Sequence, residues 1–130
     1  MPRPMMRGLS ANARAVAVAL REGRCPLGAY DLVDLLKDQG ITAPTTVYRA
    51  LDRLMKLGIV HRLESLNAYV LCARDAPHGP TVFAICEVCG NVDEFTDGHV
   101  SKRLSAWANA AMFIVKTTTI ELRGRCRNCA

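Results

Sequence analysis

Two Cys-x-x-Cys pairs constrain this 130-residue chain more than any other feature. The pairs occupy residues 86–89 and 126–129, with 36 residues between them. Each pair can present two thiolates to one ion, and four thiolates complete the closed tetrahedral shell typical of structural zinc. Two redox disulfides are the alternative, which a reducing cytosol disfavours. The predicted ligands of a structural zinc are Cys86, Cys89, Cys126 and Cys129.

The positive charge of the chain is unevenly distributed. Residues 1–74 carry 11 basic and 6 acidic side chains, whereas residues 75–130 carry six of each. An anionic partner is therefore expected to bind the first half. No apolar run approaches the roughly 18 residues of a membrane span, and no secretory signal follows the basic N-terminus. We expect a cytoplasmic protein without a membrane partner.

Hydrophobic periodicity and capping residues predict three helices in the first half. They are expected at 11–22, 29–38 and 44–57, with Leu32, Leu35 and Leu36 on the inward face of the second. Short β-type runs follow at 59–63 and 68–71 and predict a hairpin. Three helices followed by a hairpin indicate a winged helix-turn-helix.

The second half combines short strands with one helix. Strands are expected at 82–85, 92–95 and 113–122, with a helix at 97–110. This half can build only a thin core, so we expect a metal, a partner subunit or both to stabilise it. The predicted fold class is α+β, an N-terminal winged helix-turn-helix followed by a small α/β dimerisation domain. The predicted divisions are a DNA-binding domain at 1–72, a hinge at 73–80 and a dimerisation and metal-binding domain at 81–130.

The chain resembles the ferric uptake regulator family of bacterial metal-responsive repressors. The resemblance runs from about residue 10 to residue 129 and is carried by PTTVYRAL at 44–51, LGIV at 57–60 and both Cys pairs. Within the family it is most similar to the zinc uptake regulators, through AYDLV, HRLES and NAYVLC. Iron-type members usually carry His-x-His ahead of the first Cys pair, where this chain has only PHGP.

This resemblance implies a second, regulatory zinc site, and therefore two zinc ions per chain. A mixed set of sulfur, nitrogen and oxygen ligands suits four-coordinate zinc and binds more weakly than four thiolates. Asp93 or His99 could replace one member, and a manganese, iron or peroxide sensor of the same family is the nearest alternative. The implied ligands are His61, Cys72, His78 and Glu94.

The third predicted helix is the recognition helix by its position, and its outward residues predict a DNA interface. Arg49 can offer a bidentate fork to a guanine edge. The resemblance implies a homodimer that represses zinc-uptake genes when zinc is bound. A zinc hydrolase using Glu94 and a thiol redox switch are rivals from other classes, but no His-Glu-x-x-His motif is present. We expect no catalytic residue and no small-molecule substrate. The predicted DNA-contacting residues of the third helix are Thr45, Thr46, Tyr48 and Arg49. The resemblance implies Tyr30 of the second helix as a further contact, with a place in the core as the alternative for its ring.

Overall fold

The structure is a computed structural model that describes residues 8–23, 26–72 and 80–130. The chain divides into two compact units, Met1–Pro77 and His78–Ala130. Most of the predicted hinge, residues 73–79, lies outside the described residues. Among the residues that are described, no helix is long and apolar enough to cross a membrane.

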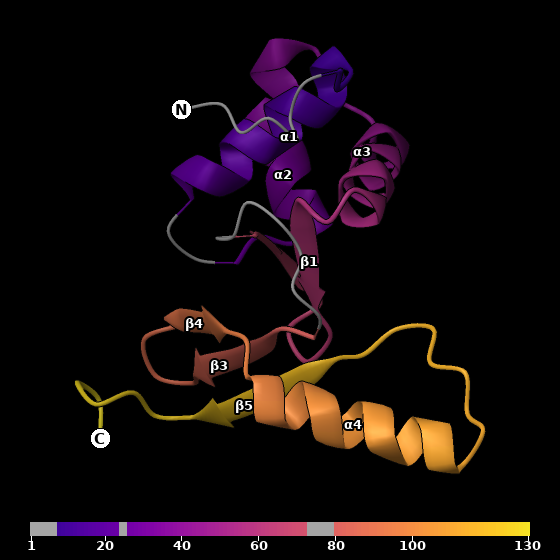
Figure 1. Cartoon of the computed structure of the whole chain (residues 1–130). Helices are drawn as coiled ribbons and strands as arrows, with labels where there is room; N and C mark the ends of the chain where they lie inside the picture. The colour runs from indigo at the N-terminus through magenta and orange to yellow at the C-terminus, as the bar shows by residue number, and fades with distance from the viewer. Residues whose placement is uncertain (1–7, 24–25, 73–79) are drawn as a thin grey trace. The chain divides into compact units, whose positions relative to one another are not determined.

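Three helices make up most of the first unit (Figure 1). The first, α1, begins after Ser10, whose side-chain oxygen accepts a hydrogen bond of 3.1 Å from the N–H of Ala13. Pro44 starts α3 at a position where the missing N–H leaves no intrahelical bond unmade. The helices are α1 (Ala11–Glu22), α2 (Ala29–Leu36), which continues as a short 3-10 turn over Lys37–Gln39, and α3 (Pro44–Lys56).

A two-stranded antiparallel hairpin completes the first unit. Strand β1 (Val60–Leu63) pairs with β2 (Ala68–Leu71). Leu27, just before α2, exchanges two backbone hydrogen bonds with Tyr69 of β2, at 2.8 and 3.1 Å. This bridge joins the hairpin to the helices and confirms the winged helix-turn-helix that the sequence predicts.

The core of the first unit is aliphatic. The buried face of α3 consists of the residues that the sequence pattern turns inward, among them Val47, Leu51 and Leu54. They pack with residues of α1 and α2 and with the start of the hairpin in one cluster. The fully buried large side chains in this unit are Val16, Leu32, Leu36, Val47, Leu51, Leu54, Ile59, Val60 and Leu63.

The second unit contains a three-stranded sheet and one helix. The strand order is β4-β3-β5, with β4 antiparallel and β5 parallel to the central strand. Asp97 caps the helix by accepting hydrogen bonds from two N–H groups of the first turn. The elements are β3 (Val82–Cys86), β4 (Val92–Phe95), α4 (Gly98–Ala110) and β5 (Ile120–Gly124).

Two sequence-based expectations are wrong in detail. The last strand begins at Ile120 rather than Phe113, because residues 113–119 form no ladder with a described strand and pairing starts where Ile120 meets Val82. Leu35 was expected to face inward with Leu32 and Leu36, but it is 54% exposed. The buried residues of α2 are Ala29, Leu32 and Leu36, and Val33 packs beside them, so the buried stripe is centred well away from Leu35 around the helix.

Candidate metal centres and nucleic-acid interface

The two Cys-x-x-Cys turns leave the same end of one sheet. Cys86 is the last residue of β3 and lies opposite Gly124 of the parallel neighbour β5. Parallel strands end at the same edge, so the turn after each strand delivers its cysteines to that edge. The N–H of Glu87 donates to the carbonyl of Gly124 at 2.8 Å and joins the two turns. Strand pairing thus brings together cysteines 36 residues apart in the sequence.

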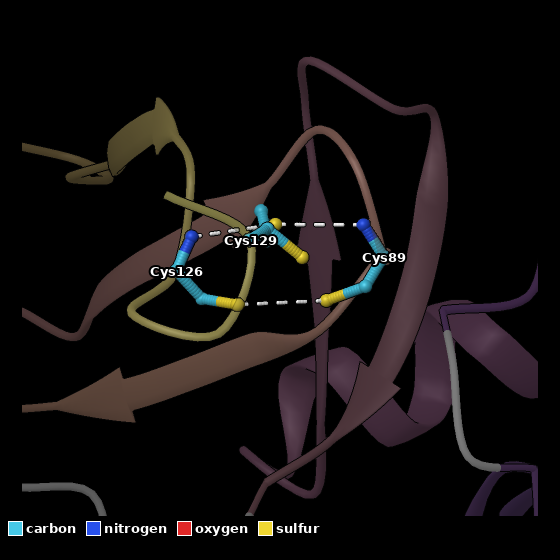
Figure 2. Close-up of side chains that lie close together, drawn as sticks. Cys89, Cys126 and Cys129 are labelled. Carbon is cyan, nitrogen blue, oxygen red and sulfur yellow. Dashed lines mark hydrogen bonds between the residues drawn. The ribbon is translucent and has the colours of Figure 1, made fainter.

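The four sulfur atoms form one compact group, which Figure 2 shows in part. All four lie within 4.8 Å of one another, and the sulfurs of Cys89 and Cys126 are 3.8 Å apart. A tetrahedral ion with zinc–sulfur bonds of about 2.3 Å requires sulfur–sulfur separations of about 3.8 Å. The donor set and its spacing therefore fit a four-coordinate zinc, with no position left for a substrate.

Backbone donors prepare one of these sulfurs to carry negative charge. The N–H groups of Cys89 and Cys126 each lie 3.4 Å from the sulfur of Cys86 and lower the pKa of that thiol to about 6. The neighbouring thiol of Cys126, together with burial, raises the pKa of Cys129 to about 12. These hydrogen bonds thus favour the thiolate on Cys86 and a retained proton on Cys129. Zinc must displace that proton, so its affinity must fall as the pH falls.

Local geometry keeps each turn tight. The N–H of Gly90 donates to the carbonyl of Cys86 at 3.0 Å, and the N–H of Cys129 donates to that of Cys126 at the same distance. Gly90 has a φ of +78°, a left-handed conformation that side chains other than glycine rarely adopt. The glycine after the first pair is therefore required by the turn itself.

A second pair of potential ligands lies on the hairpin of the first unit. The N–H of Cys72 donates to the carbonyl of Ile59 at 2.7 Å, so Cys72 lies opposite Ile59 in the ladder. Residues opposite each other or two apart on a strand share a face, which places Cys72 and His61 on one side of the hairpin. A ring nitrogen of His61 and the sulfur of Cys72 lie within 4.8 Å of each other. Cys72 is buried, and so is Nε2 of His61.

The remaining predicted sensor ligands and their alternatives differ in where they lie. His78 lies outside the described residues. Glu94 is half-buried on β4, opposite Phe83, whereas Asp93 lies opposite Ala84. Consecutive strand residues point to opposite faces, so Glu94 and Asp93 are not interchangeable ligands of one ion. His99 is exposed in the first turn of α4 and belongs to no group of three potential ligands among the described residues.

The residues predicted to contact DNA lie on the surface of the first unit. Tyr30 is 67% exposed in the first turn of α2, which excludes a core role for its ring. Tyr48 is 42% exposed, Arg49 is exposed, and Thr46 is half-buried. Thr45, Thr46, Tyr48 and Arg49 lie on the outward face of α3, and Tyr30 lies on α2. The opposite face of α3 is in the core.

Arg62 has a role that the sequence did not indicate. Its guanidinium donates to Glu64 at 2.5 Å and to Asn67 at 2.8 Å, across the turn between β1 and β2. Asn67 has a positive φ of 49°, so its backbone conformation depends on this turn. Arg62 therefore organises the tip of the hairpin, and Glu64 offsets its charge. The wing surface is consequently less basic than its sequence suggests.

Comparison with known proteins places these features in a family. The model of the ferric uptake regulator family matches residues 27–123. The zinc uptake regulation protein of Escherichia coli K12 is 40% identical over 114 residues, which are 86% of this chain and 66% of that protein. The chain thus spans slightly less than two thirds of this relative's length.

Solved structures give the same result. A zinc uptake regulator complexed with zinc and DNA has a TM-score of 0.86 and 35% identity, covering 92% of this chain and 81% of that one. The holo form of XcZur has a TM-score of 0.84 and 37% identity, and the match covers 94% of this chain and 87% of that one. Both similarities extend over both units of the chain.

Proposed function

This chain belongs to the ferric uptake regulator family, and we propose that it is a zinc-responsive transcriptional repressor that binds operator DNA as a homodimer. The genes that it represses are those of zinc uptake, and it acts in the cytoplasm. The observation that carries the proposal is the presence of two distinct sets of metal ligands, a four-thiol group and a separate His61–Cys72 pair. One set can hold the fold while the other reports the metal.

The structural zinc is held by Cys86, Cys89, Cys126 and Cys129. A closed four-thiolate shell binds zinc tightly and leaves no open position, so this ion remains bound as the cellular zinc concentration changes. It cross-links the turns after β3 and β5 in a unit that has few buried side chains. This zinc would stabilise the fold and would take part in no reaction.

The regulatory zinc is held by His61, Cys72, His78 and Glu94. His61 and Cys72 share one face of the hairpin, and Glu94 is half-buried on its strand. One thiolate and one carboxylate together neutralise the charge of Zn²⁺. Because the ligands come from both units, the bound ion favours one arrangement of the two by its differential affinity. That arrangement fixes the separation of two recognition helices, as a two-fold operator requires.

Zinc is favoured over other metals by the sulfur ligand. Cys72 is a soft ligand suited to zinc, whereas manganese prefers oxygen and nitrogen. The likeness to a zinc uptake regulation protein also supports zinc. A manganese or iron sensor of the same family is the second candidate, and the lone His78 before the first Cys pair weighs against the iron type.

A homodimer accounts for the exposed apolar side chains of the second unit. Val100, Leu104 and Trp107 follow the i, i+4, i+7 spacing of one helical stripe on α4 and are 38–62% exposed. The ring of Phe113 packs 5.7 Å from that of Trp107 and extends the stripe beyond the helix. Met112 and Ile114 are at least 90% exposed. Apolar groups so concentrated indicate a surface that another subunit covers.

Binding of duplex DNA under metal control tests the function. Duplexes selected from a random library by the zinc-loaded protein would provide the operator, and its affinity would then be measured with Zn²⁺, Mn²⁺, Fe²⁺ and no metal. We expect tight binding with zinc and binding at least tenfold weaker without metal. Equal affinity under all four conditions would contradict a metal sensor, and a response to manganese or iron alone would favour the second candidate.

A further inference from the structure

A polar cavity of about 210 Å³ lies between the start of α1 and the outward side of α3. Ser10 and Asn12 line it from α1, and Thr46, Arg49 and Arg53 line it from α3. Arg49 and Arg53 are one helical turn apart, so both guanidinium groups belong to the same side of the helix. The cavity lies wholly within the first unit.

The lining of this cavity is positively charged without compensation. None of the described residues that line it is acidic, and the first turn of α1 also contains no acidic residue. Within the described part of the chain, neither Arg49 nor Arg53 forms a salt bridge. Arg62 differs, since Glu64 already pairs with it. The cavity therefore suits an anion.

The outward residues of α3 divide into two sides. Tyr48 and Asp52 lie near enough to Tyr69 of the hairpin to influence the pKa of its phenol, which burial raises. Arg49 and Arg53 border the cavity next to α1 instead. One side of the exposed face of α3 is thus directed toward the wing and the other toward the start of α1. The cavity lies along this second side.

We propose that this cavity holds one backbone phosphate of the bound duplex, with Arg53, Thr46 and Asn12 as its ligands and Arg49 at its rim. The proposal rests on the DNA-binding function proposed above. In a helix-turn-helix, the recognition helix enters the major groove while the first helix crosses the backbone. A cavity between those two helices is therefore where a strand of the duplex passes.

The chemistry of the lining matches a phosphate group. Arg53 can donate two parallel hydrogen bonds to phosphate oxygens, and Thr46 and Asn12 can each donate one more. The hydroxyl oxygen of Ser10 already accepts from Ala13, so Ser10 acts by holding the start of α1 in place. Such contacts position the protein on the duplex but do not read its sequence.

The first test removes one charge from the cavity. Zinc-loaded Arg53→Gln would be titrated with the selected operator and with an unrelated duplex over a range of salt concentrations. We expect both affinities to fall by the same factor. The negative slope of log K against log salt should become shallower by about 0.9 for each engaged cavity. That change corresponds to binding about eightfold weaker near 0.1 M salt. Arg53→Lys should recover most of the salt dependence.

The second test adds a negative charge at an exposed site. Asn12→Asp places a carboxylate in the first turn of α1, where the helix dipole favours it, so stability should stay equal or rise. DNA binding should nevertheless weaken by about tenfold on both duplexes. Opposite effects on stability and binding would separate a contact with the anion from a loss of folding.

The matched control is Arg21→Gln. Arg21 is exposed in the last turn of α1 and does not line the cavity. Its replacement by Gln therefore removes the same charge at a site away from the cavity. We expect a much smaller change in slope than for Arg53→Gln. If Arg53→Gln and Asn12→Asp keep the slope and affinity of a parent protein that itself binds DNA, the cavity proposal is wrong while the proposed function stands. If the parent does not bind DNA with zinc, the function itself fails.

A free anion is the other source of a phosphate. Inorganic phosphate would be added to the parent protein and to Arg53→Gln at constant ionic strength. We expect no effect specific to the parent, because a single free phosphate lacks the positioning that the duplex provides. Competition with the duplex in the parent alone would identify a free-phosphate site and overturn the assignment to the DNA backbone.

Discussion

Eighteen buried apolar side chains of the described residues lie in the first unit and five in the second. Most of the first group form one cluster shared by the helices and hairpin, whereas α4 of the second unit contributes only Ala108 to the buried set. The second unit instead has four clustered thiols and a stripe of exposed apolar residues. The first unit thus contains its own core, whereas the second has few buried side chains and would be stabilised by the proposed zinc and the proposed second subunit.

Loss of the structural zinc should produce the largest effect, because it should unfold the second unit and leave the first folded. Cys126→Ser removes one of four thiolates, and structural zinc contributes on the order of 10 kcal/mol to folding in small zinc peptides. We expect the second unit to unfold while amides of the first unit stay protected from hydrogen exchange. A soluble, full-length dimer with unchanged zinc content would contradict the assignment.

A core substitution in the first unit should have the converse effect. Leu51 is fully buried on α3, and Leu51→Ala should cost about 2–5 kcal/mol through lost burial and the cavity it leaves. Because the four thiols belong to the other unit, the structural zinc should remain bound. Thermal unfolding and zinc content measured together would test this. Loss of the structural zinc in this variant would contradict the independence of the two units.

The apolar stripe of the second unit tests its dependence on a partner. Trp107 is 62% exposed and central to the stripe, so Trp107→Ala should weaken the dimer by about 2 kcal/mol or more, roughly thirtyfold. Sedimentation over a range of concentrations measures this change. Lys102→Ala, on the same helix outside the stripe, is the control and should leave the dimer unchanged. Equal dissociation constants for both variants would exclude this surface as the interface.

The smallest effect is expected at the DNA face of the first unit. Arg49→Ala should weaken specific binding by roughly 1–3 kcal/mol and relax the preference at one base pair in each half-site. Stability should hardly change, because the side chain is exposed. An unchanged ratio of specific to non-specific affinity would show that Arg49 does not read a base and acts only at the phosphate cavity.

Local patterns in the sequence were sufficient for most of the fold. The bounds of α1 follow from capping and periodicity and are confirmed. The start of β5 was wrong because β-branched residues at 113–119 resemble a strand, although pairing with β3 begins only at Ile120. Strand register depends on contacts between distant residues, and local composition does not contain that information.

The candidate sites were predictable to different extents. Spacing alone grouped the four cysteines, but the reason that they meet, the parallel pairing of β3 and β5, became visible only in the structure. The sensor set came from family resemblance, and it stays a prediction. Thr46 and Arg49 were predicted as DNA contacts, but the cavity that they line with Asn12 was missed, because Asn12 is distant from them in the sequence and ordinary in type.

The separation of metal sensing from folding is tested most directly by Cys72→Ser. Zinc content and operator binding would be measured together over a buffered zinc titration, with His99→Ala as the control that keeps the zinc response. We predict a folded dimer that retains one zinc per chain and loses zinc-dependent binding. The affinity at saturating zinc should fall about tenfold to a hundredfold, because metal at about 100 times its dissociation constant contributes about 2.7 kcal/mol. A Cys72→Ser protein that binds operator as well as the parent at every zinc concentration would contradict this account.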